Sequence, residues 1–205
     1  MRWLLSTLAL IALYILVRLT CYTVDAGEYA YVAVLGRHVA TYDGGAEGAG
    51  LHVGWPWPIQ TVQRLDRRLQ YFDLPPQELL MPDAGGKSVD KNLAVEAFVC
   101  WRIADAAAVD RFIRRLGSAD QARTILGNEI SSQLGGLARR FTLADFVSVY
   151  PGKQPGQTHV DDKVAELEQE LQTSLREQLL EQYGVDLVDV RLRRYSYAGE
   201  VRNAI

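Results

Sequence analysis

The chain has 205 residues, of which 48% are hydrophobic and 23% charged, a composition that is typical of a globular protein and excludes a fibrous or disordered one. Its formal charge of -3 provides no basic face for phosphate groups, so we expect no nucleic-acid partner. The two cysteines and three histidines lack the spacing of metal ligands, and we expect neither a metal ion nor another cofactor.

An uncharged apolar segment, residues 3–17, lies close to the amino terminus. As a helix, these residues would rise about 22 Å and residues 3–24 about 33 Å, against a hydrocarbon layer of about 30 Å. We therefore predict a transmembrane anchor over residues 1–24, with the Arg18 side chain reaching the headgroups. The side chains expected to form this anchor are Trp3, Leu4, Leu5, Leu8, Leu10, Ile11, Leu13, Ile15, Leu16 and Val17.

A cleaved signal peptide is the alternative, because a basic start followed by an apolar run is typical of one too. We favour an uncleaved anchor, since no small-x-small motif follows the run and Arg18 stands where a lipid-attachment site before Cys21 would need leucine. Arg2 and the amino terminus precede the run, and the positive-inside rule places them in the cytoplasm and the bulk of the chain outside. Arg18 lies on the other side of the run and, as a second basic residue, reduces the charge difference on which this orientation depends.

Alternation with period two predicts a first strand over residues 28–35. The glycine-rich residues 44–50 then predict a loop, and residues 55–58 (Trp-Pro-Trp-Pro) a second, rigid one. The residues expected to share one face of the first strand are Tyr29, Tyr31, Ala33 and Leu35.

Three further strands are expected before the pattern changes. Residues 61–66 and 68–73 predict short strands that pair with each other and stop at Pro75 and Pro76. Residues 91–103 give the longest alternation in the chain. Their expected inward face consists of Leu93, Val95, Ala97, Val99, Trp101 and Ile103.

Helical periodicity then predicts two consecutive helices. Residues 109–116 form the first, which Gly117 ends as a left-handed cap. Ser118 and Gln121 have the spacing of a capping box for the second, which we expect to break at residues 135–136, a Gly-Gly pair.

The last third of the chain returns from helix to strand. A short helix containing Phe146 and a polar loop over residues 151–158 precede a long helix over residues 161–182, which Gly184 ends. Residues 186–195 predict a final strand. Strands, then helices, then one more strand favour an α+β fold, in which helices pack on a mainly antiparallel sheet.

The same segments, in the same order, carry a set of motifs that is weak singly and specific together. These are Gly27-Glu28, Leu35-Gly36-Arg37, Gly50-Leu51-His52, Leu65-Asp66-Arg67-Arg68-Leu69, Leu74-Pro75-Pro76, Asp90-Lys91-Asn92-Leu93, Trp101-Arg102-Ile103-Ala104-Asp105, and residues 184–191, which read GVDLVDVR. Over about 180 residues the chain thereby resembles the SPFH (band 7, prohibitin-homology) superfamily, and within it the bacterial HflC branch most.

The resemblance implies a domain plan. After the anchor, residues 25–85 would form a first SPFH subdomain and residues 86–200 a second. Residues 201–205 would start the helix that relatives continue as a coiled coil, so the chain is read as a fragment or as a short member.

The resemblance also implies a function: a non-enzymatic scaffold that assembles into homo- or hetero-oligomers on membrane lipid. The HflC branch pairs with HflK-like subunits and regulates the membrane AAA+ protease FtsH, which implies the bacterial inner membrane and a periplasmic location for most of the chain. A stomatin- or flotillin-like lipid scaffold without a protease partner shares every motif. A membrane-tethered hydrolase is the third alternative, although no Gly-x-Ser-x-Gly motif is present.

Three groups of surface residues are candidates for contacts. Trp55 and Trp57 would lie in the membrane interface or, equally, pack on the sheet. Basic residues could pair with anionic lipid or a neighbouring subunit, although a solvated strand face is the favoured interpretation. Acidic residues of the long helix would help to close a ring or form its solvated face. These charged residues are Arg64, Arg67, Arg68, Glu166, Glu170 and Glu177.

Overall fold

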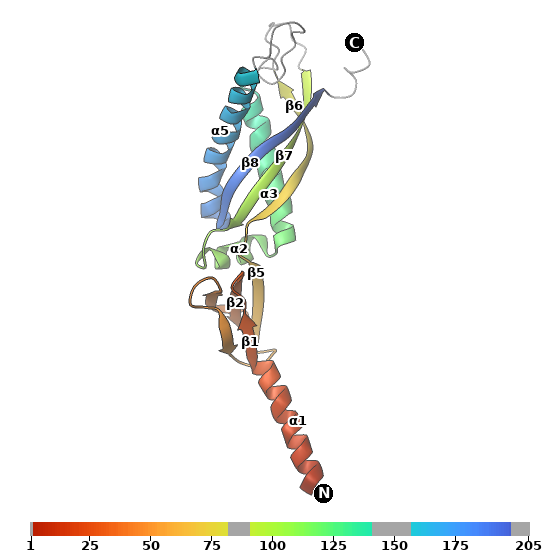
Figure 1. The fold of residues 1–205 in the computed structure, drawn as a ribbon, viewed down its shortest axis with the longest axis vertical. Coiled ribbons are helices and arrows are strands. Elements are labelled where there is room, and N and C mark those ends of the chain that lie inside the picture. The colour runs from red at the N-terminus through yellow and green to blue at the C-terminus, as the bar shows by residue number, and fades with distance from the viewer. Residues whose placement is uncertain (1, 82–90, 141–156, 198–205) are drawn as a thin grey trace. The chain divides into compact units, whose positions relative to one another are not determined.

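In a computed structural model, the described residues are 2–81, 91–140 and 157–197 (Figure 1). The chain divides into two compact units, Met1–Arg68 with Ile103–Arg114, and Leu69–Arg102 with Arg115–Ile205. The first unit thus ends earlier than the predicted boundary at residue 85 and regains residues 103–114 later in the chain. Residues this far apart in sequence join because the Tyr31 hydroxyl donates a 3.0 Å hydrogen bond to Asp110.

The apolar amino-terminal segment forms helix α1, Arg2–Thr20. The prediction of one anchor over residues 1–24 is wrong in its last four residues, which form strand β1, Cys21–Val24. β1 pairs antiparallel with β4, Gly50–Val53, so that Tyr22 faces His52 across the pair. These backbone hydrogen bonds end the helix at Thr20. Within the described part of the chain, no helix has both the length and the apolarity to cross a bilayer.

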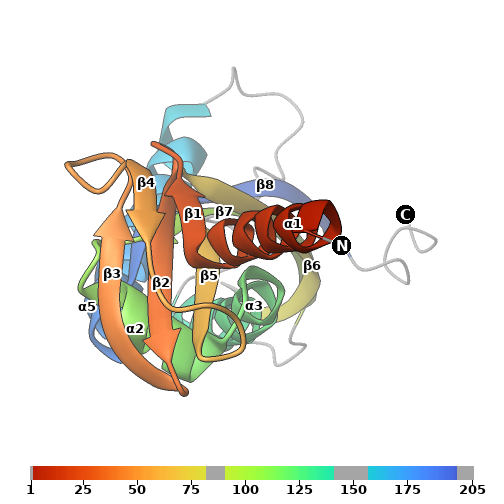
Figure 2. The same ribbon diagram turned by 90° about the horizontal axis from the view of Figure 1, so that it is seen from below.

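The main sheet of the first unit has the strand order β3-β2-β5 (Figure 2). Its strands are β2, Glu28–Val34; β3, Arg37–Asp43; and β5, Gln60–Asp66. Both pairings are antiparallel, and the strands expected near residues 28–35 and 61–66 are confirmed. β2 is buried along most of its length; Tyr31 bonds to Asp110 of the helix Ala108–Leu116, and β1 also contacts the strand. Leu35, expected to share a strand face with Tyr29, Tyr31 and Ala33, instead occupies the turn to β3 with φ 50° and is exposed.

The sheet of the second unit has the order β6-β7-β8, with β6, Gln70–Met81; β7, Lys91–Ile103; and β8, Val185–Tyr197. Two predictions about this region are wrong. Residues 68–73 do not pair with β5, because β6 pairs with β7 and β5 with β2. The two prolines do not end the strand either, since a register shift between Leu74 and Gln77 accommodates them.

The helices agree with the predictions except at one point. They are α2, Ala108–Leu116; α3, Ala119–Ala138; and α5, Gln157–Tyr183. The Ser118 side chain caps α3 by accepting a hydrogen bond from the Gln121 amide, as its spacing predicted, and Gly117 has φ 74°. The expected break at residues 135–136 is wrong: α3 continues to Ala138, because buried Leu134 and Leu137 hold its last turn in the core.

The core of the second unit lies between its sheet and its two long helices. α3 packs against β6 and α5, and α5 packs against β8. Among its most completely buried side chains are Val99 and Trp101 of β7, Leu126, Ile130 and Leu134 of α3, and Leu167, Leu171, Leu175 and Leu179 of α5. The α+β prediction is therefore confirmed. The predicted helix around Phe146 lies outside the described residues.

Candidate membrane-contacting surface

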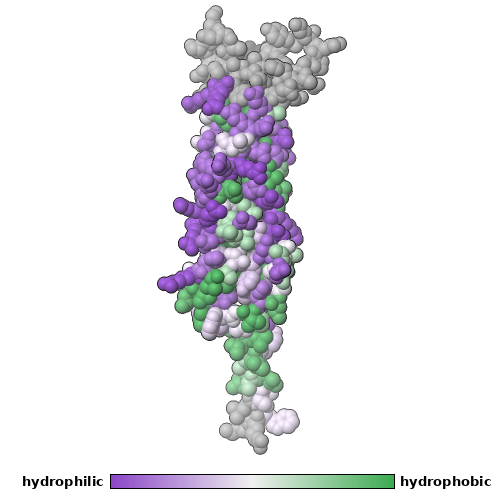
Figure 3. Space-filling view, turned by 90° about the vertical axis from the view of Figure 1, so that its left-hand side faces the viewer, coloured by the Kyte–Doolittle hydropathy of each residue, from purple (hydrophilic) through white to green (hydrophobic). Residues whose placement is uncertain are grey.

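α1 exposes apolar side chains along its whole length. From Trp3 at 87% to Val17 at 48%, the side chains have no covering layer in the part of the chain that the structure describes. An apolar surface of this kind is clear at one end of the space-filling view (Figure 3). A helix that is apolar around its circumference needs an apolar surrounding. The exposed anchor residues are Trp3, Leu4, Leu8, Leu10, Ile11, Leu13, Ile15, Leu16 and Val17, whereas the side chain of Leu5 is outside the described ones.

The Trp-Pro-Trp-Pro loop, residues 55–58, begins next to the carboxyl end of α1 in space. The Gly54 amide donates a 2.8 Å hydrogen bond to the Thr20 carbonyl, and the Trp55 amide donates one of the same length to Gln60 Oε1. Trp55 and Trp57 are 64% and 70% exposed, so their rings do not pack under the sheet. Exposed indoles next to an apolar helix are typical of residues at headgroup depth, but their interfacial role stays a prediction.

The structure adds three apolar side chains that the sequence did not single out. Leu35, Val39 and Val53 are each more than 60% exposed. The Leu35 amide bonds to the Ile59 carbonyl, which brings the β2–β3 turn to the loop that carries the tryptophans. We call Leu35, Val39, Val53, Trp55 and Trp57 the apolar collar. A cluster of this kind indicates an interaction surface, whereas single exposed apolar residues do not.

The three arginines considered as interface residues all have neighbours within the first unit. Arg64 donates to the Thr23 carbonyl and lies 3.7 Å from Glu28. Arg67 lies 3.3 Å from Asp43, and its guanidinium stacks over an aromatic ring of β2. The Arg68 guanidinium lies against Gly27. Contacts of these arginines with lipid or another subunit stay a prediction.

The acidic residues of α5 fall into two environments. Glu166 and Glu177 are exposed, and Glu170 pairs with Arg140 at the surface. Glu168, which the sequence did not distinguish, is buried and accepts hydrogen bonds from Arg191 and from the Leu192 amide of β8. A buried carboxylate with two donors fixes α5 on β8. Among the described acids of α5, Glu168 is thus held by contacts within the second unit.

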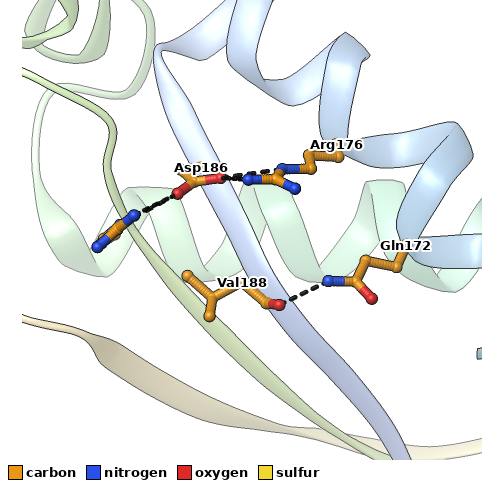
Figure 4. A network of polar contacts seen from close by, with 5 residues as sticks. Gln172, Arg176, Asp186 and Val188 are labelled. Carbon is orange, nitrogen blue, oxygen red and sulfur yellow. Dashed lines mark hydrogen bonds and ion pairs between the residues drawn. The ribbon is translucent and has the colours of Figure 1, made fainter. Parts of the chain in front are cut away.

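A second polar network joins three elements of the second unit (Figure 4). Asp186 at the start of β8 accepts hydrogen bonds from Arg102 of β7 at 2.9 and 3.0 Å, and from Arg176 of α5 at 3.1 Å. Gln172 of α5 donates to the Val188 carbonyl of the same strand. Asp186 belongs to one of the family-like motifs, and its place in the structure gives it a structural role.

Three titratable side chains of the first unit, those of Tyr31, Asp110 and Arg114, form a hydrogen-bonded cluster. Burial raises the pKa of Asp110, but hydrogen bonds from Arg114 and Tyr31 outweigh it and hold that pKa below the ordinary value. Burial, and then the bond to Asp110, raise the pKa of Tyr31. These pKa shifts indicate that Asp110 is charged and hydrogen-bonded, and they do not indicate an activated base.

The thiol of Cys100 is not activated. Cys100 is half-buried, and burial raises the pKa of its thiol, which lowers its reactivity. Among the described residues, no three or more His, Cys, Asp or Glu side chains group as a metal site would require. The exposed apolar side chains of α1 and the apolar collar therefore support contact with an apolar phase.

Comparison with known proteins gives one result for the family and one for individual proteins. Residues 22–205 match the family described as SPFH domain / Band 7 family. No curated protein matches the chain.

Proposed function

Because this chain belongs to the SPFH domain / Band 7 family, we propose that it is a membrane-attached scaffold subunit that assembles with other subunits. The family is generally one of non-enzymatic scaffolds. We therefore expect its role to be steric: the assembled subunits would cover membrane surface and limit the access of other proteins to it.

The exposed apolar surface of α1 carries this proposal. Burial of apolar area contributes about 25 cal/mol per Å², so nine large side chains left in water would be strongly unfavourable. Lipid around α1 removes that cost. The collar at the end of α1 would then lie at headgroup depth, with its two indoles in the region that tryptophan favours.

The proposal extends to a specific partner. The motifs quoted above resemble the HflC branch most, which supports pairing with an HflK-like subunit and restraint of the AAA+ protease FtsH. A wall of such subunits would limit the access of membrane substrates to the protease. The proposed location is the bacterial inner membrane, with the residues after α1 on the periplasmic side.

Isolation of the tagged full-length protein from native membranes, in mild detergent, tests these statements separately. We expect assemblies that contain an HflK-like subunit and the AAA+ protease. Large assemblies without the protease would contradict the regulatory role and favour a lipid scaffold of the stomatin or flotillin type. A monomer without either partner would contradict the scaffold proposal itself.

A further inference from the structure

A cavity of about 540 Å³ opens in the first unit beside the end of α1. Even-numbered residues of β2, Val32 and Val34, line one side of it, and the loop after β4 lines the other. Odd-numbered residues of β2 point to the opposite face, where Tyr31 bonds to Asp110 of α2. The cavity thus belongs to the side of the sheet that faces the β1–β4 pair. Its volume is within the range of about 300–1,000 Å³ that is usual for small-ligand sites.

A β-bulge shapes the mouth of this cavity. Val32 is paired with Ala40 and Ala33 with His38, so Val39 is the extra residue on β3. Val39 and Ala40 consequently both line the cavity, although neighbouring residues of a regular strand would face opposite sides. Val39, Val53 and Trp55 are members of the apolar collar, which makes the mouth of the cavity apolar.

Polar but uncharged side chains also line the cavity. They are those of Tyr22, Tyr42 and Gln60, and Gln60 is buried and accepts a hydrogen bond from the Trp55 amide. A tyrosine hydroxyl can donate one hydrogen bond, so either tyrosine offers a donor to a ligand. None of the described lining residues carries a charge, which excludes an ion and favours a ligand with a neutral acceptor.

The position of the cavity next to α1 favours a lipid among the ligands that carry a neutral acceptor. Thr20, the last residue of α1, lines it, and the Gly54 amide bonds to the Thr20 carbonyl. The carboxyl end of α1 therefore lies at the cavity. If α1 lies in lipid, the mouth opens where acyl chains meet their ester groups.

We propose that this cavity binds one acyl chain of a membrane glycerolipid, with the ester carbonyl of the lipid accepting a hydrogen bond from the hydroxyl of Tyr22 or Tyr42. The inference rests on the proposed membrane attachment of α1 and adds a defined lipid site to it. Bound in this way, a lipid would fix the first unit against the membrane surface more firmly than α1 alone.

Photolabelling tests the site in the full-length protein reconstituted into phospholipid vesicles. The probe is a phosphatidylcholine with a diazirine midway along one acyl chain, and labelled peptides are identified by mass spectrometry. We expect label on α1 and on peptides that contain Val34, Val39 and Trp55. A photoreactive free fatty acid added from solution is the second probe. Labelling of the cavity by the fatty acid and not by the phospholipid would overturn the assignment to a glycerolipid.

Two variants with a matched control make the test specific. Ala40→Phe fills the cavity, and Val39→Gln makes its mouth polar at an exposed position that the fold tolerates. Either should reduce cavity labelling on the order of tenfold, which corresponds to about 1.4 kcal/mol of binding free energy. Leu51→Phe, at an exposed position of β4 that does not line the cavity, should leave labelling unchanged.

The outcomes separate this inference from the one on which it rests. Label on α1 with none on the cavity peptides of the wild type would overturn the lipid site alone. Absence of label from α1 as well would overturn membrane attachment. Equal labelling of the wild type and Val39→Gln would show that the cavity does not hold the chain.

Discussion

The Asp186 carboxylate joins three elements of the second unit. Its side chain is 11% exposed, whereas those of its partners Arg102 and Arg176 are 53% and 58% exposed. The carboxylate is therefore the group that depends on its hydrogen bonds, because either arginine regains water when the contact is lost. Asp189, two residues along the same strand, pairs with Arg191 at the surface instead.

This difference predicts unequal effects of two similar substitutions. Asp186→Ala should lower the free energy of unfolding by about 1–2 kcal/mol, since a nearly buried group with several donors is removed. Asp189→Ala should change it by less than about 1 kcal/mol, as exposed ion pairs usually do. Urea unfolding of the detergent-solubilised full-length chain, followed by circular dichroism, measures both. Equal losses would contradict a special role for Asp186.

At the scale of elements, α3 shows how tertiary packing overrides a local signal. Two consecutive glycines near its end favour a break, because glycine lowers helix stability by about 1 kcal/mol relative to alanine. Leu134 on one side of the pair and Leu137 on the other are buried, and their contacts retain the helical path. The two glycines therefore remain in the helix and lower its stability, and replacing one of them with alanine should restore part of that stability.

Gly136→Ala should raise the free energy of unfolding by about 0.5–1 kcal/mol. Gly136 is exposed, and an added Cβ would meet no atom of the described chain within 4 Å, so only the helix propensity changes. The control is Gly117→Ala, which should lower the same free energy by about 1–2 kcal/mol because Gly117 has φ 74°. Thermal unfolding compares the two variants, and destabilisation by Gly136→Ala would indicate a contact with another molecule at that position.

At the scale of the whole molecule, the chain combines an apolar helix with two units that have cores of their own. The apolar side chains of α1 contribute little to either core, because they remain exposed. A change in α1 should therefore alter where the protein is found without altering how the units fold. This separation makes membrane attachment testable in the intact protein.

Ile11→Arg places a charge at the middle of α1 and should weaken membrane attachment by about 2.5–3.5 kcal/mol, roughly 100-fold or more in partitioning. Flotation of the protein with liposomes measures the bound fraction. Val188→Arg, a substitution of an exposed valine on β8, is the control and should float like the wild type. Flotation of Ile11→Arg that equals that of the wild type would contradict attachment through α1.

Most of the elements followed from local pattern. The alternation of residues 91–103 predicted both the bounds of β7 and its buried face, which includes Val95, Val99 and Trp101. The capping of α3 by Ser118 was predictable for the same reason, since the bond to Gln121 spans three residues. Signals that act within one or two turns of helix, or a few residues of strand, are visible in sequence.

The candidate site was predictable only in part. The apolar run of α1 and the two tryptophans of its neighbouring loop stood out by composition. The rest of the collar did not, because Leu35 alternates with the buried residues of β2 and only the turn to β3 exposes it. Val39 lines the cavity because of a β-bulge, and the alternation of side chains in the sequence does not predict a bulge.

The sequence by itself determined most of the longer helices and strands, the apolar segment at the amino terminus and the motifs that carry the family resemblance, because each depends on residues close together in the chain. It did not reveal the strands β1, β3 and β4. The tertiary structure alone decided which strands pair, where α1 ends, and which carboxylates are buried. Pairing of β1 with β4 and of β2 with β5 joins residues about thirty apart, and the free energy of those contacts depends on the assembled sheet rather than on any local pattern.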